Sequence, residues 1–230
     1  MGFSTIKARG VLRVGTCGNY PPFSYSVAAG ERVGLDVKLA LRFGQQLGVR
    51  TVFVPFKWPQ LINDLKQHRF DLAMSGINIT ESRQAVATFS DAYVTSGAMP
   101  LIAPHLDART VEEINRSGLR IVVNQGGYLE SVARRVFGNA AIFTITENLQ
   151  LGEYVARDNA DALLTDSLEA PYILQGNPTL RPLPRITTDK HAALFPKRDS
   201  ELRDAFNQLL QHLTRTGRFD RLKAIYGITD

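Results

Sequence analysis

The chain has 230 residues and a formal net charge of +5, and 44% of its residues are hydrophobic and 21% charged. This is the composition of a globular protein that can bury one large core or two smaller ones. Lysine and arginine are scattered and form no basic run with interleaved aromatic residues, which argues against a nucleic-acid-binding protein. No apolar run approaches the roughly 18 residues of a membrane-spanning helix.

The single cysteine, Cys17, excludes an intrachain disulfide and a cysteine-cluster metal site. The four histidines show no ligand spacing, so we expect no metal. The first ten residues, MGFSTIKARG, contain no hydrophobic signal segment. They are therefore expected in a cytosolic protein or in an exported protein after its signal has been removed.

Strands and helices are expected to alternate in the first third of the chain. The helix at 34–48 has apolar residues at helical spacing, with Asp36 as its expected N-cap and Gly48 at its end. A second helix has Pro59 in its first turn. The expected strands are 11–17, 50–56 and 70–77, and the expected helices are 34–48 and 58–69.

The same alternation returns in the middle of the chain. The expected strands are 119–127, 141–145 and 160–166, and the expected helices are 128–137 and 148–158. Alternation of this kind predicts an α/β protein with mostly parallel sheets and helices on their faces. Two extended, proline-containing segments, 89–105 and 181–196, interrupt it. They are either long edge strands or two crossovers that join two α/β lobes.

Four stretches of this sequence resemble a known family: GVLRVGTCGNYPPFSY, GLDVKLA, FDLAMSGINITESRQAVATFSDAYVTSG and ADALLTDSLEAPYIL. They are similar to family 3 of the bacterial solute-binding proteins, which bind amino acids in the periplasm. The resemblance implies the two-lobed periplasmic-binding-protein fold of type II, with two crossover strands. Residues 4–93 and 192–230 would form one lobe and 94–191 the other, with the ligand cleft between them.

Arg83 is the principal ligand-binding candidate in the first lobe. Its planar guanidinium matches a carboxylate, and the preceding Thr80 can cap a helix and present its hydroxyl. The alternative is a surface arginine in a first helical turn, and the resemblance favours the carboxylate partner. Ser75 and Gly76 end a strand, where backbone groups face the ligand in open α/β sheets.

Three aromatic residues, Tyr20, Phe23 and Trp58, are candidates for apolar walls around a ligand. An isolated aromatic residue is more often part of the core. Trp58, which opens a helix directly after a strand, is better placed for a ligand site. We assign no chemistry to Cys17.

The expected second lobe contains a Gly126–Gly127 pair before a helix, whose bare N–H groups could meet an anion. Such a pair by itself is a weak signal. Tyr128 would place a phenol where the family often has a small hydroxyl. Asn124, just before the pair, is a further ligand-binding candidate.

Within the family, the sequence is most similar to the cyclohexadienyl dehydratase branch, through Trp58, Asn124 and Glu169. That enzyme carries Gly-Gly-Thr-Asn at the turn where this chain has Tyr128 and Leu129 after the glycines. It also tends to carry a lysine at the position of Ala98. The asparagine is implicated in catalysis, so these departures bear on activity.

Asp166 and Glu169 permit two interpretations. Asp-x-x-Glu at a helix start is typical of a capping box. The resemblance instead implies that Asp166 binds the ammonium group of a ligand in transport proteins and that Glu169 is the general acid in the dehydratase. Such an acid needs a raised pKa, which burial beside Trp58 and proximity to Asp166 would favour.

Two functions follow, and the resemblance favours the first narrowly. One is an exported prephenate or arogenate dehydratase, a lyase of phenylalanine biosynthesis that needs no cofactor. The other is a periplasmic solute-binding protein that delivers an amino acid to the membrane permease of an ABC importer or to a sensor. In both cases the partner is a small carboxylate or amino acid, with no nucleic acid.

Overall fold

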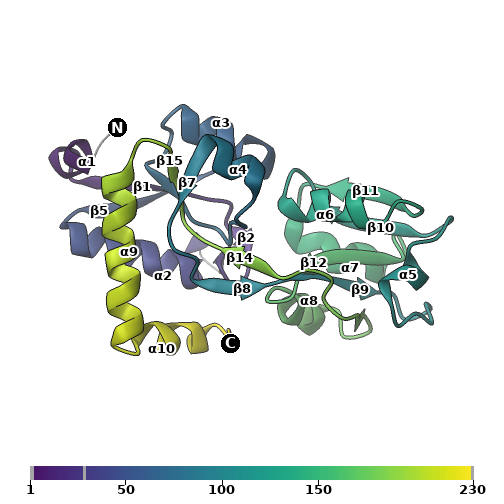
Figure 1. Ribbon diagram of the computed structural model, residues 1–230. Coiled ribbons are helices and arrows are strands. Elements are labelled where there is room, and N and C mark those ends of the chain that lie inside the picture. Colours follow the sequence, from purple (N-terminus) through teal and green to yellow (C-terminus); the bar gives the residue numbers. More distant parts are fainter. Residues whose placement is uncertain (1–2, 28–29, 229–230) are drawn as a thin grey trace. The chain divides into compact units, whose positions relative to one another are not determined.

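The computed structural model describes residues 3–27 and 30–228 of the chain. The chain divides into two compact units, which we call unit 1 (Met1–Thr95 with Lys190–Asp230) and unit 2 (Ser96–Asp189) (Figure 1). Both contain a five-stranded sheet with helices. The expected α/β class is confirmed, whereas the position of the ligand cleft stays a prediction.

The sheet of unit 1 has the order β5-β1-β6-β15-β7. Strand β1 is parallel to β5 and β6, whereas β15 is antiparallel to β6 and β7. The strands are β1 (Val11–Thr16), β5 (Arg50–Pro55), β6 (Leu72–Ala73), β7 (Ala87–Phe89) and β15 (Leu194–Pro196). A small antiparallel sheet contains β2 (Asn19–Tyr20), β3 (Ser24–Ser26) and β4 (Arg32–Val33).

Helix α2 (Leu35–Leu47) packs on β1 and β5 because Leu39, Phe43 and Leu47 recur at the spacing of one helical face and are buried. It ends at Gly48, which has φ of +70° as expected for a left-handed C-cap. The other helices of unit 1 are α1 (Phe3–Arg9), η2 (Trp58–Gln60), α3 (Leu61–Lys66), α4 (Glu81–Val86), α9 (Ser200–Arg215) and α10 (Arg218–Ile225).

The expected role of Asp36 as the N-cap of α2 is wrong. The N-cap residue is Gly34, and no side chain caps the helix. Asp36 lies inside the first turn, 1% exposed, and its carboxylate accepts hydrogen bonds from distant residues. A buried carboxylate with such partners is not available to the helix end.

The sheet of unit 2 repeats the arrangement of unit 1, with the order β11-β10-β12-β9-β13. Strand β10 is parallel to β11 and β12, whereas β9 is antiparallel to β12 and β13. The strands are β9 (Ala98–Ile102), β10 (Arg120–Asn124), β11 (Ala141–Ile145), β12 (Ala162–Asp166) and β13 (Arg181–Pro182). The helices are α5 (Val111–Ile114), α6 (Tyr128–Val136), η3 (Asn148–Gln150), α7 (Leu151–Ala156) and α8 (Ala170–Gly176).

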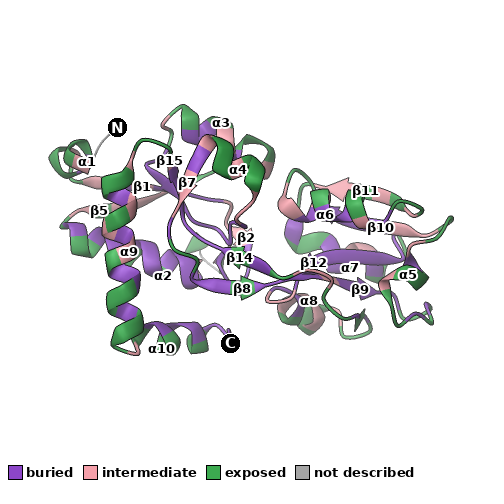
Figure 2. Cartoon of the chain, in the orientation of Figure 1, coloured by how far each residue is buried: buried purple, intermediate pink, exposed green. Residues whose placement is uncertain are grey.

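Both faces of the unit 2 sheet are covered. Ile121 and Val123 point into a core shared with α6, whereas Val122 between them packs with residues of α7 and α8. Successive side chains of a strand point to opposite faces, so a sheet covered on both sides needs continuous apolar strands. Strand β12 is buried along its whole length (Figure 2).

Strands β8 (Val94–Ser96) and β14 (Asp189–His191) pair with each other in a two-stranded sheet. The division between the units falls within both strands, so the chain passes from one unit to the other in each. The expected crossovers are therefore confirmed. Within residues 3–27 and 30–228, no helix has the length and apolar character needed to cross a membrane.

Candidate functional site

The predicted site residues fall into two groups, one in each unit. Unit 1 contains seven of them: Tyr20, Phe23, Trp58, Ser75, Gly76, Thr80 and Arg83. Unit 2 contains the other five: Asn124, Gly127, Tyr128, Asp166 and Glu169. Their assignment to a ligand stays a prediction.

Arg83 is held in the first turn of α4 by its neighbours. The hydroxyl of Thr80, the N-cap residue, accepts the backbone N–H of Arg83 at 3.3 Å, as the sequence predicts. One guanidinium nitrogen donates to the carbonyl oxygen of Asn78 at 2.9 Å, and the guanidinium carbon lies 5.8 Å from the centre of the Trp58 ring. The guanidinium is therefore oriented by a carbonyl and an aromatic face, while the residue is only partly buried.

The three aromatic candidates of unit 1 lie together. The rings of Tyr20 and Phe23 are 5.4 Å apart, and Trp58 meets Tyr20 edge-on at 6.1 Å. Tyr20 and Phe23 are buried, whereas Trp58 is half-buried. Because Trp58 also contacts Arg83, the structure joins the aromatic candidates to the cationic one.

Ser75 and Gly76 follow β6 in a buried turn. The hydroxyl of Ser75 accepts the backbone N–H of Cys17 at 3.1 Å and lies 2.9 Å from the Cys17 sulfur. Gly76 has φ of +62°, and a Cβ there would lie within 2.8 Å of atoms in the Phe23 and Tyr20 rings. The backbone therefore passes so close to the aromatic residues that only glycine fits.

Asn78 was missed by the sequence reasoning. It is 6% exposed, and its side-chain Nδ2 has no hydrogen-bond partner among the described residues. Its carbonyl orients Arg83. A buried donor without an acceptor costs free energy, so this amide is a candidate donor to a ligand oxygen. Its place in the segment between Ser75 and Arg83 is the signal that could have identified it.

The N-terminus of helix α6 differs from the sequence-based expectation in one of its backbone N–H groups. Gly127 is the N-cap residue of α6, as predicted, but the N–H of Gly126 is already bonded to the Glu130 carboxylate at 2.7 Å. Although partial burial raises the pKa of Glu130, the Gly126 N–H and the neighbouring Arg134 lower it overall. The expectation of a bare N–H at Gly126 is therefore wrong, because the protein supplies its own anion there.

Tyr128 and Asn124 flank this turn. The phenol of Tyr128 donates to Asp189 at 2.6 Å, and its partial burial together with this carboxylate raises its pKa to about 12. Asn124 is 5% exposed, and its Oδ1 has no partner among the described residues. That oxygen lies 3.7 Å from the position that a Cβ of Gly127 would occupy. Asn124 and Gly127 are therefore adjacent, whereas the Tyr128 hydroxyl is engaged elsewhere.

Asp166 ends β12 and is 1% exposed. One carboxylate oxygen accepts the Ser96 hydroxyl at 2.5 Å, and the other accepts the backbone N–H of Leu168 at 2.8 Å. These bonds fix the orientation of a buried negative charge.

Glu169 does not form the capping box that was one of its two interpretations. It is the N-cap residue of α8, but its side chain makes no cap hydrogen bond. Instead its carboxyl accepts from the hydroxyl of Thr165 at 2.6 Å and from the amide of Asn148 at 2.5 Å. Burial raises its pKa to about 8, since desolvation outweighs these two bonds, and Asp166 adds a smaller increase. The sequence reasoning missed Asn148, which lies 21 residues away.

Two further positions have apolar side chains where the dehydratase pattern carries polar ones. Ala98 and Leu129 are 0% and 8% exposed, and both belong to the hydrophobic core between β9, β10, β12 and α6. An amide or an ammonium group at these positions would be buried in an apolar core.

Among the described residues, one set of possible metal ligands lies close together. The ligand atoms of His105, Asp158 and Asp161 are within 4.8 Å of one another. The guanidinium of Arg120 donates to both carboxylates, at 3.2 Å and 2.9 Å. The cluster is therefore explained as an ion pair, and the expectation of no metal site stays a prediction.

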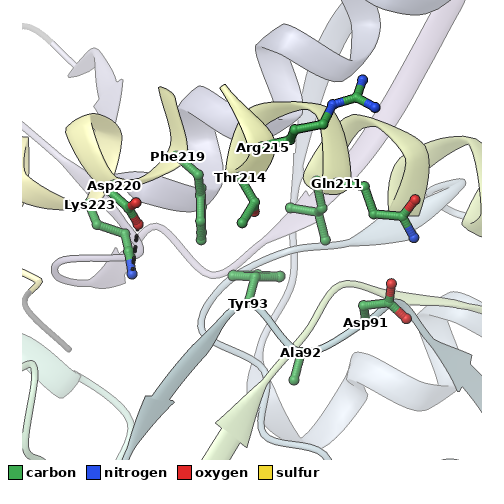
Figure 3. A pocket seen from close by; sticks show the side chains of 10 residues that line it. Asp91, Ala92, Tyr93, Gln211, Thr214, Arg215, Phe219, Asp220 and Lys223 are labelled. Carbon is green, nitrogen blue, oxygen red and sulfur yellow. Dashed lines mark ion pairs between the residues drawn. The ribbon is translucent and has the colours of Figure 1, made fainter. Parts of the chain in front are cut away.

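A separate pocket of about 820 Å³ lies in unit 1 against α9 and α10 (Figure 3). The rings of Tyr93 and Phe219 line it together with Asp220 and Lys223, which form an ion pair at 3.2 Å. None of the predicted site residues lines this pocket.

Comparison with known proteins identifies the family. The cyclohexadienyl dehydratase of Pseudomonas aeruginosa is 40% identical over 167 residues, which cover 72% of this chain but only 62% of that protein. A histidine-binding periplasmic protein of Escherichia coli is 26% identical over 234 residues, covering 94% of this chain and 86% of that protein.

A solved structure extends the likeness along the whole chain. The crystal structure of an ancestral amino-acid-binding protein, described as a precursor of cyclohexadienyl dehydratase, has a TM-score of 0.93 and 31% identity. The match covers 97% of this chain and 98% of that one. The sequence profile of family 3 matches residues 12–229. The chain belongs to the bacterial extracellular solute-binding proteins, family 3.

Proposed function

We propose that this protein binds a free amino acid outside the cytoplasm and delivers it to a membrane permease or a sensor, without transforming it. The observation that carries the proposal is that Arg83 is oriented by the backbone carbonyl of Asn78, a residue whose buried side-chain amide has no hydrogen-bond partner among the described residues. A ligand carboxylate accepts hydrogen bonds from both, and the planar guanidinium matches its two oxygens.

The buried carboxylate of Asp166 supports recognition of an ammonium group. Its bonds to Ser96 and Leu168 are local and fix its position within unit 2. A pre-oriented carboxylate favours a cation, because no ordering is needed when the ligand arrives. Every amino acid carries an ammonium group, so Asp166 supports the same ligand class as Arg83 does.

The ligands in the names of the relatives belong to this class. The Escherichia coli relative is named for histidine, and the ancestral structure is named for amino acids. Further relatives are named for arginine and cystine. Which amino acid this chain binds is part of the test.

Burial of Ala98 and Leu129 argues against dehydration chemistry. These are positions where the dehydratase pattern carries a lysine and a catalytic asparagine. Here they contribute methyl and methylene groups to the core of unit 2. The carboxyl of Glu169 is bonded to Thr165 and Asn148, so its proton would reach a substrate only if the side chain turned away from both.

A cyclohexadienyl dehydratase is the second candidate, and two observations favour it. The relative with 40% identity is that enzyme. The pKa of Glu169, raised by burial to about 8, keeps this side chain protonated at neutral pH, as a general acid requires. In that reaction Glu169 would give its proton to the departing hydroxide of prephenate or arogenate.

Two assays on the purified wild-type protein distinguish the candidates. Thermal-shift screening against the common L-amino acids, followed by calorimetry, is expected to find at least one amino acid that binds. Incubation with prephenate or arogenate is expected to form no phenylpyruvate or phenylalanine. Turnover that falls by about 10²-fold or more in Glu169→Gln would establish the dehydratase instead.

A further inference from the structure

The backbone N–H and the backbone carbonyl of Gly76 are each held by a buried side chain of unit 1. The carboxylate of Asp36 accepts its N–H at 2.7 Å, and Nδ1 of His191 lies 2.9 Å from its carbonyl oxygen. Because a carbonyl only accepts, the His191 ring donates from Nδ1 in this contact. Asp36 is 1% exposed and His191 0%, so both bonds are shielded from water. We call Asp36 and His191 the Gly76 clamp.

The clamp holds Gly76 at a point where aromatic rings crowd the backbone. A Cβ on Gly76 would lie 2.5 Å from the Phe23 ring and 2.7 Å from the Tyr20 ring. The His191 ring itself lies 4.7 Å from the ring of Phe23. A change of the backbone torsion angles at Gly76 would therefore break a buried hydrogen bond or move an aromatic residue of the candidate site.

Asp36 is in turn fixed by Tyr93. The phenol of Tyr93 donates to the second carboxylate oxygen at 2.8 Å. The backbone N–H of Tyr93 donates to the carbonyl of His191 at 3.0 Å, so the two residues are neighbours on adjoining segments. The clamp is thus anchored in the segments at β8 and β14, in which the chain leaves and re-enters unit 1.

A backbone ladder connects His191 to Arg83. The N–H of Ala192 donates to the carbonyl of Ile77, and the N–H of Ile79 donates to the carbonyl of Lys190. Asn78, between these two rungs, accepts the guanidinium of Arg83 on its carbonyl. The orientation of the Gly76–Ile79 backbone therefore determines where the Arg83 guanidinium is anchored.

We propose that Asp36 and His191 are positioning residues of the amino-acid site, which hold the Gly76–Asn78 backbone in the conformation that binds ligand. This inference rests on the proposed function. Both clamp residues are buried and act through the backbone that carries Asn78 and orients Arg83.

Two substitutions at His191 separate hydrogen bonding from packing. His191→Phe keeps a ring against Phe23 but removes the donor to Gly76. His191→Asn removes the ring but places an amide nitrogen near the position of Nδ1. A positioning role predicts that affinity for the amino acid falls by about tenfold or more in His191→Phe, the range for loss of a buried hydrogen bond, and is largely retained in His191→Asn.

A ligand-free measurement tests the clamp independently. The carbonyl 13C shift of Gly76 and the exchange rate of its amide proton are expected to change in His191→Phe and to stay near the wild-type values in His191→Asn. Tyr93→Phe, which keeps the ring and frees one oxygen of Asp36, provides a milder perturbation. It is expected to accelerate Gly76 exchange, whereas Tyr154→Phe in unit 2 leaves it unchanged.

Two results would overturn the proposal. One is wild-type affinity and unchanged Gly76 signals in a folded His191→Phe protein. The other is an equal loss of affinity in both His191 variants, which would assign His191 to packing alone. If the wild-type protein binds no amino acid, the proposed function fails, whereas the Gly76 signals still decide whether the clamp exists.

Discussion

The amide of Asn148 donates a 2.5 Å hydrogen bond to the carboxyl of Glu169 in the interior of unit 2, and both residues are at most 3% exposed. The two belong to different segments, η3 and the turn before α8. The contact turns Glu169 away from its own helix and into a water-excluded position. Burial at this position raises the pKa of Glu169 to about 8 although the hydrogen bonds from Thr165 and Asn148 lower it, and this makes the group a sensitive reporter of folding.

Glu169 is expected to make unit 2 less stable as the pH rises. Its pKa is about 8 in the folded protein and near 4.5 when exposed, so the folded state holds this proton more tightly. Its contribution is fully present below pH 4.5 and is lost as the pH rises through 8, at about 1.4 kcal/mol per pKa unit. Urea unfolding at pH 5, 7 and 9 measures the loss.

In Glu169→Gln this part of the pH dependence should vanish, because a neutral amide can still bond to Asn148 and Thr165. The variant should therefore be more stable than the wild type at pH 9. Asp36, whose pKa burial raises to about 6, titrates in both proteins and cancels in the comparison. Glu153→Gln, on an exposed position of α7, is the control. Parallel pH profiles for wild type and Glu169→Gln would contradict the assignment.

Arg83→Ala is expected to weaken amino-acid binding by roughly 2–5 kcal/mol, the range for truncating one partner of a buried charge pair. Arg83→Lys keeps the charge but loses the planar fork, so it should recover only part of the affinity. Calorimetry measures both variants beside Arg42→Ala, which removes an exposed arginine of α2. Undiminished affinity in Arg83→Ala would remove this residue from the site.

Asp166→Asn is expected to abolish selectivity for the ammonium group while the fold is retained. The asparagine oxygen can accept from Leu168, and its amide can donate to the Ser96 hydroxyl. Affinity for the amino acid should fall by at least tenfold, whereas affinity for the matching acid without the amino group should hardly change. Calorimetry with both ligands checks this. Asp158→Asn, which alters a 78% exposed side chain, should bind as the wild type does.

Leu129→Asn is expected to destabilise unit 2 by about 2–4 kcal/mol, because it removes apolar contacts and buries an amide in the core. Leu129→Met keeps the volume and should cost less than about 1.5 kcal/mol. Urea unfolding compares the two. If Leu129→Asn were as stable as Leu129→Met, the site would tolerate the polar side chain of the enzyme pattern.

The sequence by itself predicted the local elements well, because their signals are local. Strand β11 lies at 141–145 as expected, and the cap residues Gly48 and Thr80 lie where the pattern put them. These features depend on the period of apolar residues and on backbone preferences within a few residues. The resemblance to family 3 was likewise readable from short motifs.

Only the tertiary structure decided which partner each polar side chain has. Asp36 had a local option as a helix cap, but its carboxylate bonds to Gly76, 40 residues away, and to Tyr93. Glu169 had the same option and bonds instead to Asn148 and Thr165. Burial determines which hydrogen-bond partners these carboxyl groups have and how far their pKa values shift. The reason is that the cost of removing a charge from water depends on everything packed around it.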